Sequence, residues 1–356
     1  NKTFYFGEKE FAYTIQVEDK EEGNYLFVME IPEGTKEISV WVGISGTDEV
    51  GAAANLKSEL LSGDHDFDII RSRASSIWEQ ELGKIQVKSA QEDVLKHFYT
   101  ALYHTFIHPS LWTDVDGRYR DYNDQIQTSD KSLYSVFSLW DTYRGANPLY
   151  TIIQPKKVSD FVSSFYQQYK NTGLLPVWTL SNNETNCMIG YHSVSVIADA
   201  YLKGIPLEDP EGLLEAMIAS STADQFGKKQ YEETGFISAN TLAESVSRTL
   251  EYAYDDWAIA QLAKHLNKTE IYNQFIKRSE NWKNNFDKTI GFMRPRLADG
   301  SFKKDFDVLS THGQGFIEGN SWNYSFFVPQ NPDELITMMG GKKKFASKLD
   351  ELFTMH

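Results

Sequence analysis

A single acidic residue, Glu318, lies in a turn rich in glycine and aromatic residues that spans 312–324. A carboxyl group surrounded by aromatic rings loses hydration and stays protonated near neutral pH, as a general acid requires. The helix expected around Trp322 offers the opposite interpretation, because an acid at a helix N-terminus is stabilised in its ionised form. The residues of this turn leave both interpretations of Glu318 open.

A second group of reactive side chains lies in the segment 138–144, where Trp140, Asp141 and Arg144 fall within five positions. One interpretation, which the spacing alone favours, is a buried tryptophan beside an Asp–Arg ion pair. The other is a sugar pocket, in which the ring of Trp140 covers the C–H face of a pyranose. Asp141 and Arg144 would then bind neighbouring hydroxyl groups through charge-assisted hydrogen bonds.

Two further segments carry polar residues whose role the pattern leaves undecided. Glu184 and His192, in the loop 183–192, either face a cleft or cap and anchor the loop. Asp255 and Asp256 lie on a predicted helix, either on its solvated side or bonded to a neighbouring loop, so a structural role is favoured. The segment 114–117 resembles the start of a calcium loop but lacks the later ligands, which favours a turn.

The elements that must position these residues change character along the chain. Short runs rich in β-branched and aromatic residues, at 3–6, 11–17, 25–29 and 38–44, predict antiparallel strands. A helical period at 69–82 then predicts a connection between two domains. The later ranges predicted to be helical are 91–107, 157–170, 190–203, 210–222, 241–265, 268–286 and 342–354. A β-sandwich followed by helices with long joints predicts an α/α barrel, whose loops at one end build the site.

The composition of the 356 residues weighs against several classes of protein. Lysine and arginine number 35 against 50 aspartates and glutamates, a net charge of −15 that repels phosphate backbones and anionic lipid. The lone cysteine, Cys187, excludes an intrachain disulfide and a cysteine zinc site. No apolar run reaches the length of about 18 residues that a membrane span needs. A first residue other than Met and an amphipathic tail without a stop signal suggest a piece of a longer protein.

Taken together, these segments resemble glycoside hydrolase family 92, the calcium-dependent α-mannosidases. The resemblance runs nearly the whole chain in the family's order and is specific as a set, although no single segment is diagnostic. It rests on the segments 42–45, 54–56, 138–144, 173–178, 184–192, 246–256, 318–324 and 328–341.

The resemblance implies a fold, a reaction and a set of site residues. Members of this family have an N-terminal β-sandwich packed on an (α/α)6 barrel and remove terminal α-linked mannose with inversion. Glu318 matches the family's catalytic acid. The residues that the resemblance implies for binding the substrate are Trp140, Asp141, Arg144, Glu184, His192, Asn320 and Trp322.

Two parts of the family's machinery are expected beyond His356. Inversion needs a second carboxylate as general base, with a water between the two acids, and in the family this base and the loop near the calcium lie downstream of the Glu318 motif. Calcium is therefore an implied cofactor with no ligand predicted here. We expect 1–62 to be the C-terminal part of the β-sandwich, 63–90 a linker helix, and 91–356 a barrel truncated at the C-terminus. Such a fragment is expected to be inactive alone.

The expected partner is a glycan with terminal mannose, and the acidic pI, the lack of disulfides and the resemblance suggest a periplasmic, secreted or cell-surface location. Three alternatives remain. Another inverting (α/α)6 glycosidase, of the glucosidase or trehalase type, would differ in the aryl glycosides it hydrolyses. A non-catalytic sugar-binding protein would bind sugar without the Glu318 carboxyl. A helical interaction scaffold would bind no saccharide.

Overall fold

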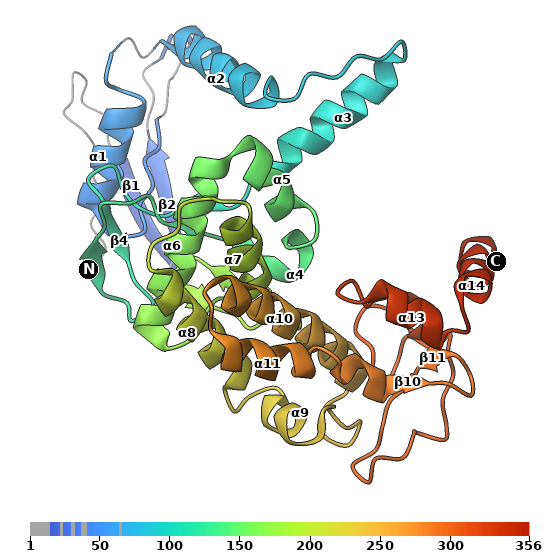
Figure 1. Cartoon of the computed structure of the whole chain (residues 1–356). Helices are drawn as coiled ribbons and strands as arrows, with labels where there is room; N and C mark the ends of the chain where they lie inside the picture. The colour runs from blue at the N-terminus through green and yellow to red at the C-terminus, as the bar shows by residue number, and fades with distance from the viewer. Residues whose placement is uncertain (1–14, 22–23, 30–32, 37–40, 64–65, 356) are drawn as a thin grey trace. The chain divides into compact units, whose positions relative to one another are not determined.

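The computed structural model describes residues 15–21, 24–29, 33–36, 41–63 and 66–355, and their contacts divide the chain into two compact units (Figure 1). The first unit comprises 1–86, 112–119 and 126–130, and the second comprises 87–111, 120–125 and 131–356.

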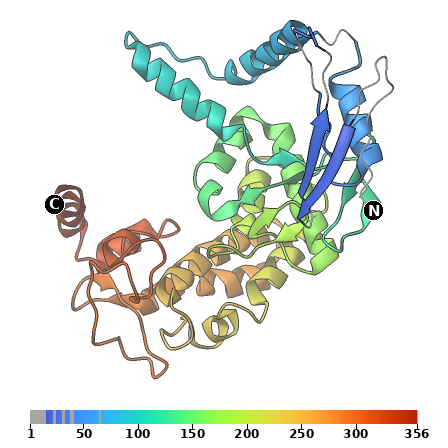
Figure 2. The same ribbon diagram turned by 180° about the vertical axis from the view of Figure 1, so that it is seen from behind.

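The first unit contains a β-hairpin and two helices. The strands β1 (Ile15–Glu21) and β2 (Asn24–Met29) pair antiparallel and lie side by side (Figure 2). The helices are α1 (Glu49–Glu59) and α2 (Phe67–Leu82), and α2 is helical where the sequence predicted a helix. The strand β5 (Ile126–Thr128) pairs with β4 (Arg118–Arg120).

The predicted strands of the first unit are only partly observed. The run at 25–29 lies within β2, and the end of the run at 11–17 begins β1. Residues 3–6, 11–14 and 38–40 lie outside the described residues. The prediction of a strand is wrong for 41–44, because this segment packs against α1 instead of pairing with a strand: a Cβ on Gly43 would lie 2.2 Å from the Ala52 carbonyl oxygen.

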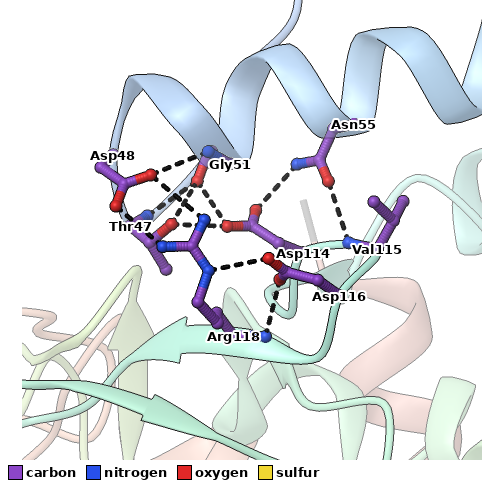
Figure 3. Close-up of polar contacts among 9 residues, drawn as sticks. Thr47, Asp48, Gly51, Asn55, Asp114, Val115, Asp116 and Arg118 are labelled. Carbon is purple, nitrogen blue, oxygen red and sulfur yellow. Dashed lines mark hydrogen bonds and ion pairs between the residues drawn. The ribbon is translucent and has the colours of Figure 1, made fainter.

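A network of polar contacts holds the start of α1 against the turn at 114–117 (Figure 3). Asp48 caps α1 by accepting a hydrogen bond from Gly51 N at 2.8 Å and forms an ion pair with Arg118 at 2.8 Å. The buried Asp114 carboxylate accepts hydrogen bonds from Thr47 Oγ1 at 2.6 Å and from Asn55 Nδ2 at 2.8 Å. Gly117 N donates to the Asp114 carbonyl at 2.9 Å, which confirms the turn.

The helices of the second unit occupy nearly all the ranges predicted to be helical. They are α3 (Glu92–Thr105), α5 (Ala146–Ile153), α6 (Pro155–Thr172), α7 (Ser193–Leu202), α8 (Pro210–Thr222), α9 (Lys228–Thr234), α10 (Ser245–His265), α11 (Thr269–Arg278), α13 (Pro332–Met338) and α14 (Lys342–Thr354). The sequence did not predict α5, α9 and α13. The helix predicted over 268–286 ends at Arg278, and the 3-10 turn η1 (Asn281–Asn285) that follows buries Trp282 in the core.

The core of the second unit is built around α10, which packs against α7, α8 and α11 (Figure 1). Ile197 of α7, Met217 of α8, Ile259 and Leu262 of α10, and Phe275 of α11 are all buried in one cluster. Burial of large apolar side chains on facing helices is the main favourable contribution to such packing. Because α10 is packed against three other helices, the side chains on its remaining surface are held in fixed positions.

Small sheets and two short helices hold the joints between the long helices. The sheet nearest the predicted site residues has the order β7 (Phe137–Ser138), β8 (Trp178–Leu180) and β9 (Asn183–Glu184), all antiparallel. The short helix α4 (Leu139–Thr142) follows β7 directly, so this sheet fixes where the segment with Trp140 begins. The other short elements are β3 (Ser110–Leu111), β6 (Tyr134–Ser135), β10 (Phe286–Asp287), β11 (Phe292–Met293) and α12 (Ser321–Tyr324).

The described residues thus form a mixed fold of many helices and small antiparallel sheets, without a closed barrel among them. Within the described part of the chain, no helix combines the length and apolar character needed to cross a membrane.

Candidate active site

A pocket of about 240 Å³ in the second unit brings together residues from two separate joints and from α10. Its lining residues are Trp140, Arg144, Glu251, Glu318, Asn323, Tyr324 and Phe327. Three of them, Trp140, Arg144 and Glu318, were predicted from the sequence as site residues. The pocket therefore combines two carboxyl groups, one guanidinium group and several aromatic rings.

Aromatic rings fix the guanidinium group of Arg144 at the pocket. Its Cζ atom lies 5.6 Å from the ring centre of Trp140, 4.8 Å from that of Tyr143 and 5.8 Å from that of Phe327. Arg144 also donates a hydrogen bond to the Trp140 carbonyl oxygen at 3.2 Å. Because the Arg144 side chain is 49% exposed, a ligand can reach it.

Asp141 does not line the pocket. Its exposed carboxylate accepts a hydrogen bond from Ser138 Oγ instead. The Asp141–Arg144 ion pair that the spacing favoured is therefore wrong, because the fold pairs Arg144 with Glu251, whose Oε1 lies 4.0 Å from Arg144 Nη2.

Glu251, on α10, is buried in the pocket wall with an exposed fraction of 1%. Its Oε1 accepts a hydrogen bond from Trp140 Nε1 at 3.0 Å. Its Oε2 accepts one from Tyr143 Oη at 3.4 Å and lies 3.1 Å from His192 Nε2. The sequence pattern did not single out Glu251. It lies four residues before Asp255, and this spacing, which places both acids on one face of a helix, could have marked it as a site residue.

His192 lies behind the pocket wall and does not line it. Its Nδ1 is 2.8 Å from Asp255 Oδ1, and the ring of Tyr143 stacks on the imidazole at 4.0 Å between ring centres. Burial opposes protonation of the ring, but Asp255 and Glu251 together outweigh it and raise the pKa of His192 to about 9. At neutral pH both ring nitrogens therefore carry protons.

The backbone before His192 leaves room for this arrangement only because it contains a glycine. Gly190 has a φ of 83°, a conformation that side chains disfavour, and a Cβ there would lie 2.2 Å from His192 Nε2. Any other residue at position 190 would displace the imidazole from Glu251.

The acids Asp255 and Asp256 are fully buried, so the prediction of a solvated position is wrong and the alternative of a bond to a neighbouring loop is confirmed. Asp255 accepts a hydrogen bond from Tyr191 N at 2.8 Å, and burial raises the pKa of its carboxyl. Asp256 accepts hydrogen bonds from Tyr191 Oη at 2.8 Å and from Arg278 Nε at 3.0 Å. Burial raises the pKa of Asp256 to about 6. Both acids thereby fix the segment that carries His192.

Glu184 lies in the loop-anchoring position that was one of its two interpretations. Its carboxylate accepts hydrogen bonds from Val177 N at 2.9 Å, Trp178 N at 2.9 Å and Asn186 N at 2.7 Å. Gln168 Nε2 donates a fourth at 3.1 Å. Glu184 is not among the lining residues, and these contacts connect the sheet to α6.

Glu318 reaches the pocket from a turn that is tied to the start of α10. Val246 N donates to the Gly315 carbonyl at 2.9 Å, and Ile317 N donates to Ser247 Oγ at 3.1 Å. Glu318 itself is exposed and has a φ of 46°, which is unfavourable for a residue with a side chain. A strained backbone of this kind is frequent at functional sites.

Asn320, and not Glu318, caps the helix α12. Its Oδ1 accepts hydrogen bonds from Trp322 N at 3.0 Å and from Asn323 N at 3.3 Å. Trp322 is buried against Phe292, with the two rings nearly perpendicular at 4.8 Å. Neither Asn320 nor Trp322 lines the pocket, whereas Asn323 and Tyr324 do.

No group of three or more His, Cys, Asp or Glu side chains that could hold a metal ion occurs among the described residues. The donor set among these residues therefore does not fit the implied calcium. What the pocket does offer is an exposed carboxyl group for proton transfer, aromatic faces and hydrogen-bonding groups, a combination suited to a sugar ring.

Residues 51–356 match the family model described as the glycosyl hydrolase family 92 catalytic domain. An uncharacterized secreted glycosidase of Arthroderma benhamiae is 27% identical over 374 residues, which cover 93% of this chain and 44% of that protein.

Solved structures of the same family resemble this one. A family GH92 α-mannosidase from Bacteroides thetaiotaomicron matches with a TM-score of 0.84 and 36% identity, covering 88% of this chain and 42% of that chain. A family GH92 inverting mannosidase from the same organism matches with a TM-score of 0.83 and 29% identity, covering 92% and 45%. The chain thus spans less than half the length of these relatives.

Proposed function

Because this chain belongs to glycosyl hydrolase family 92, we propose that its protein is a glycosidase that removes terminal α-linked mannose from glycans with inversion of configuration. Support comes from the two Bacteroides relatives, which are described as an α-mannosidase and as an inverting mannosidase. The first of them is also known in complex with mannoimidazole, which supports a mannose-type ligand for the equivalent pocket.

The observation that carries the proposal is the position of Glu318 in a pocket wall shared with Trp140 and Arg144. As general acid, Glu318 would donate its proton to the glycosidic oxygen as the bond to the anomeric carbon breaks. Trp140 would cover a C–H face of the ring, and Arg144 would donate hydrogen bonds to hydroxyl oxygens. The tie of the Glu318 turn to α10 supports this role, because proton transfer requires a fixed geometry.

The remaining parts of the proposal rest on the family resemblance. A second carboxylate, downstream of Glu318, would act as general base and activate a water on the opposite face of the sugar. Calcium would assist the reaction from ligands outside the described residues. The complete protein would have a β-sandwich packed on an (α/α)6 barrel, and a secreted or periplasmic location is supported by the secreted Arthroderma relative.

The test compares Glu318→Gln with the wild type in the full-length protein. Hydrolysis of an α-linked mannose disaccharide is expected to fall roughly 100-fold or more, because a sugar leaving group must be protonated. An aryl mannoside needs less protonation and is expected to lose much less. Glu232→Gln, an exposed carboxylate on α9, is the matched control and should retain activity. Added chelator tests the calcium requirement in the same assay.

The outcomes separate the alternatives. Full activity of Glu318→Gln on the disaccharide would remove Glu318 as the acid. Hydrolysis of glucosides in place of mannosides would favour the glucosidase or trehalase type. Sugar binding without any hydrolysis, equal in wild type and Glu318→Gln, would favour a non-catalytic sugar-binding protein.

A further inference from the structure

The buried acid Glu251 has no part in the reaction proposed above, although it lines the same pocket as Glu318. Burying an ionised carboxylate costs free energy unless the charge is paired and hydrogen-bonded. Here Trp140 and Tyr143 donate hydrogen bonds to the Glu251 carboxylate, and His192 Nε2 lies 3.1 Å from it. These contacts offset the cost of burying this acid in the wall of a ligand pocket.

The two oxygens of Glu251 differ in how much of their hydrogen-bonding capacity the protein uses. Each carboxylate oxygen can accept about two hydrogen bonds. Tyr143 Oη donates to Oε2, and His192 Nε2 lies 3.1 Å from the same oxygen. Oε1 accepts one hydrogen bond, from Trp140 Nε1 at 3.0 Å, while Arg144 Nη2 is 4.0 Å away and beyond hydrogen-bonding distance. Among the described residues, Oε1 therefore keeps room for one more donor.

We propose that Glu251 binds the substrate directly, with Oε1 accepting a hydrogen bond from a hydroxyl group of the sugar ring in the pocket. The proposal rests on the function proposed above and deepens it by naming a second substrate-binding carboxylate. The donor comes from the ligand, since Arg144 Nη2 lies 4.0 Å from Oε1 and the guanidinium is held over the ring of Tyr143.

His192 and Asp255 act as positioning residues for this contact. His192 lies between the two acids, at 3.1 Å from Glu251 Oε2 and 2.8 Å from Asp255 Oδ1. The stacked ring of Tyr143 prevents the imidazole from turning. Since all these groups are buried, Glu251 Oε1 keeps its position before the sugar arrives, and less conformational entropy is lost on binding.

The charges around the pocket select a neutral polyhydroxyl ligand. An anionic ligand would be repelled by the carboxylate of Glu251, and a cationic ligand would be repelled by the guanidinium of Arg144, which lies over Trp140 in the same wall. A sugar hydroxyl avoids both repulsions, because it donates to Glu251 and accepts from Arg144.

The test is a thermodynamic cycle between the residue and the ligand in the full-length protein. Calorimetry measures the affinity for methyl α-D-mannopyranoside and for its four monodeoxy analogues. Removing the hydroxyl that contacts Glu251 is expected to weaken binding to the wild type by roughly 10-fold or more. The same removal should weaken binding to Glu251→Gln much less. In that variant the hydrogen bond between the hydroxyl group and the Glu251 carboxylate is already lost, so deleting the hydroxyl removes little more.

Glu232→Gln is the control, since Glu232 is an exposed acid on α9 that does not line the pocket. It should keep the wild-type pattern of affinities across the analogues. Should Glu251→Gln fail to fold, Glu251→Asp keeps the charge while moving the carboxylate back by one methylene, and the same loss of coupling is expected.

Equal losses in wild type and Glu251→Gln for every analogue would overturn the role of Glu251 and leave the sugar pocket intact. If the wild type bound all four monodeoxy analogues as tightly as methyl α-D-mannopyranoside, the role of Glu251 would be overturned without measurements on a variant. Absence of binding of every mannoside to the wild type would overturn both this role and the proposed function.

Discussion

His192 shows how strongly the surroundings of one residue change its chemistry. Its imidazole is fully buried, an environment that on its own favours the neutral ring. The carboxylates of Asp255 and Glu251 lie within 3.1 Å of its two nitrogens and reverse that preference. The protonated ring then places a positive charge between the two acids, within 3.1 Å of both.

The raised pKa of His192 predicts a stability that depends on pH. The folded-state pKa of about 9 lies above the ordinary value of 6.5, so protonation favours the folded state. This contribution is fully present below pH 6.5 and is lost as the pH rises through 9. Its size is on the order of 3 kcal/mol. Denaturant unfolding of wild type and His192→Gln between pH 6 and 9 should show a steeper fall for the wild type.

A matched comparison is needed because Lys228 titrates in the same range. Burial lowers the pKa of Lys228 to about 8, so its contribution to the free energy of unfolding increases with pH. This contribution is the same in wild type and His192→Gln and cancels in the difference between them. Parallel curves for wild type and His192→Gln would contradict the assigned charge of His192.

The elements owe their positions to polar contacts between segments distant in the chain as much as to apolar packing. In the first unit, the turn at 114–117 supplies Asp114 as a common acceptor for Ser45, Thr47 and Asn55 beside α1 (Figure 3). Gly51 permits this close approach, because a Cβ there would lie 2.3 Å from Asp114 Oδ2.

We expect Asp114→Ala to loosen α1 locally. Removing the shared acceptor costs about 2 kcal/mol, which would speed hydrogen exchange of the α1 amides by roughly 30-fold. Asp116→Ala is the control from the same turn: Asp116 is exposed and its carboxylate accepts from the backbone N and the side chain of Arg118, so α1 protection should hardly change. Equal protection of α1 in Asp114→Ala and wild type would show that the network does not hold this helix.

At the scale of the whole molecule, the chain carries a net charge of −15 and spans less than half the length of its relatives. An inverting glycosidase needs two carboxyl groups about 6.5–9.5 Å apart with a water between them. The resemblance places the second of these downstream of Glu318, outside the described residues.

We therefore expect residues 1–356 by themselves to give no measurable hydrolysis of α-linked mannose disaccharides, while the full-length protein is active. The assay compares product release by equal amounts of the two proteins, with circular dichroism as the control for folding. Turnover by residues 1–356 would require a base within this chain, and Glu251 would then be the first carboxylate to substitute, since it shares the pocket with Glu318.

The sequence by itself determined most of the long helices of the second unit, but not α5, α9 and α13, and the joints that carry Trp140, Arg144 and Glu318. Helical periodicity and turn residues are local signals, so α8 and α14 begin and end where the pattern predicted. Where packing with distant residues decided the conformation, local patterns failed, as in the segment 41–44, which packs against α1 without forming a strand.

Only the tertiary structure decided which polar residues face the pocket. Asp141 is one residue from Trp140, yet it turns to Ser138, whereas Glu251, far along the chain, lies against Trp140 and His192. The pairing of Glu251 with His192 depends on the packing of α10 beside α7, which no local pattern encodes. The carboxylates that this packing brings beside His192 then set its charge against the effect of burial, because the energy of a charge depends on everything packed around it.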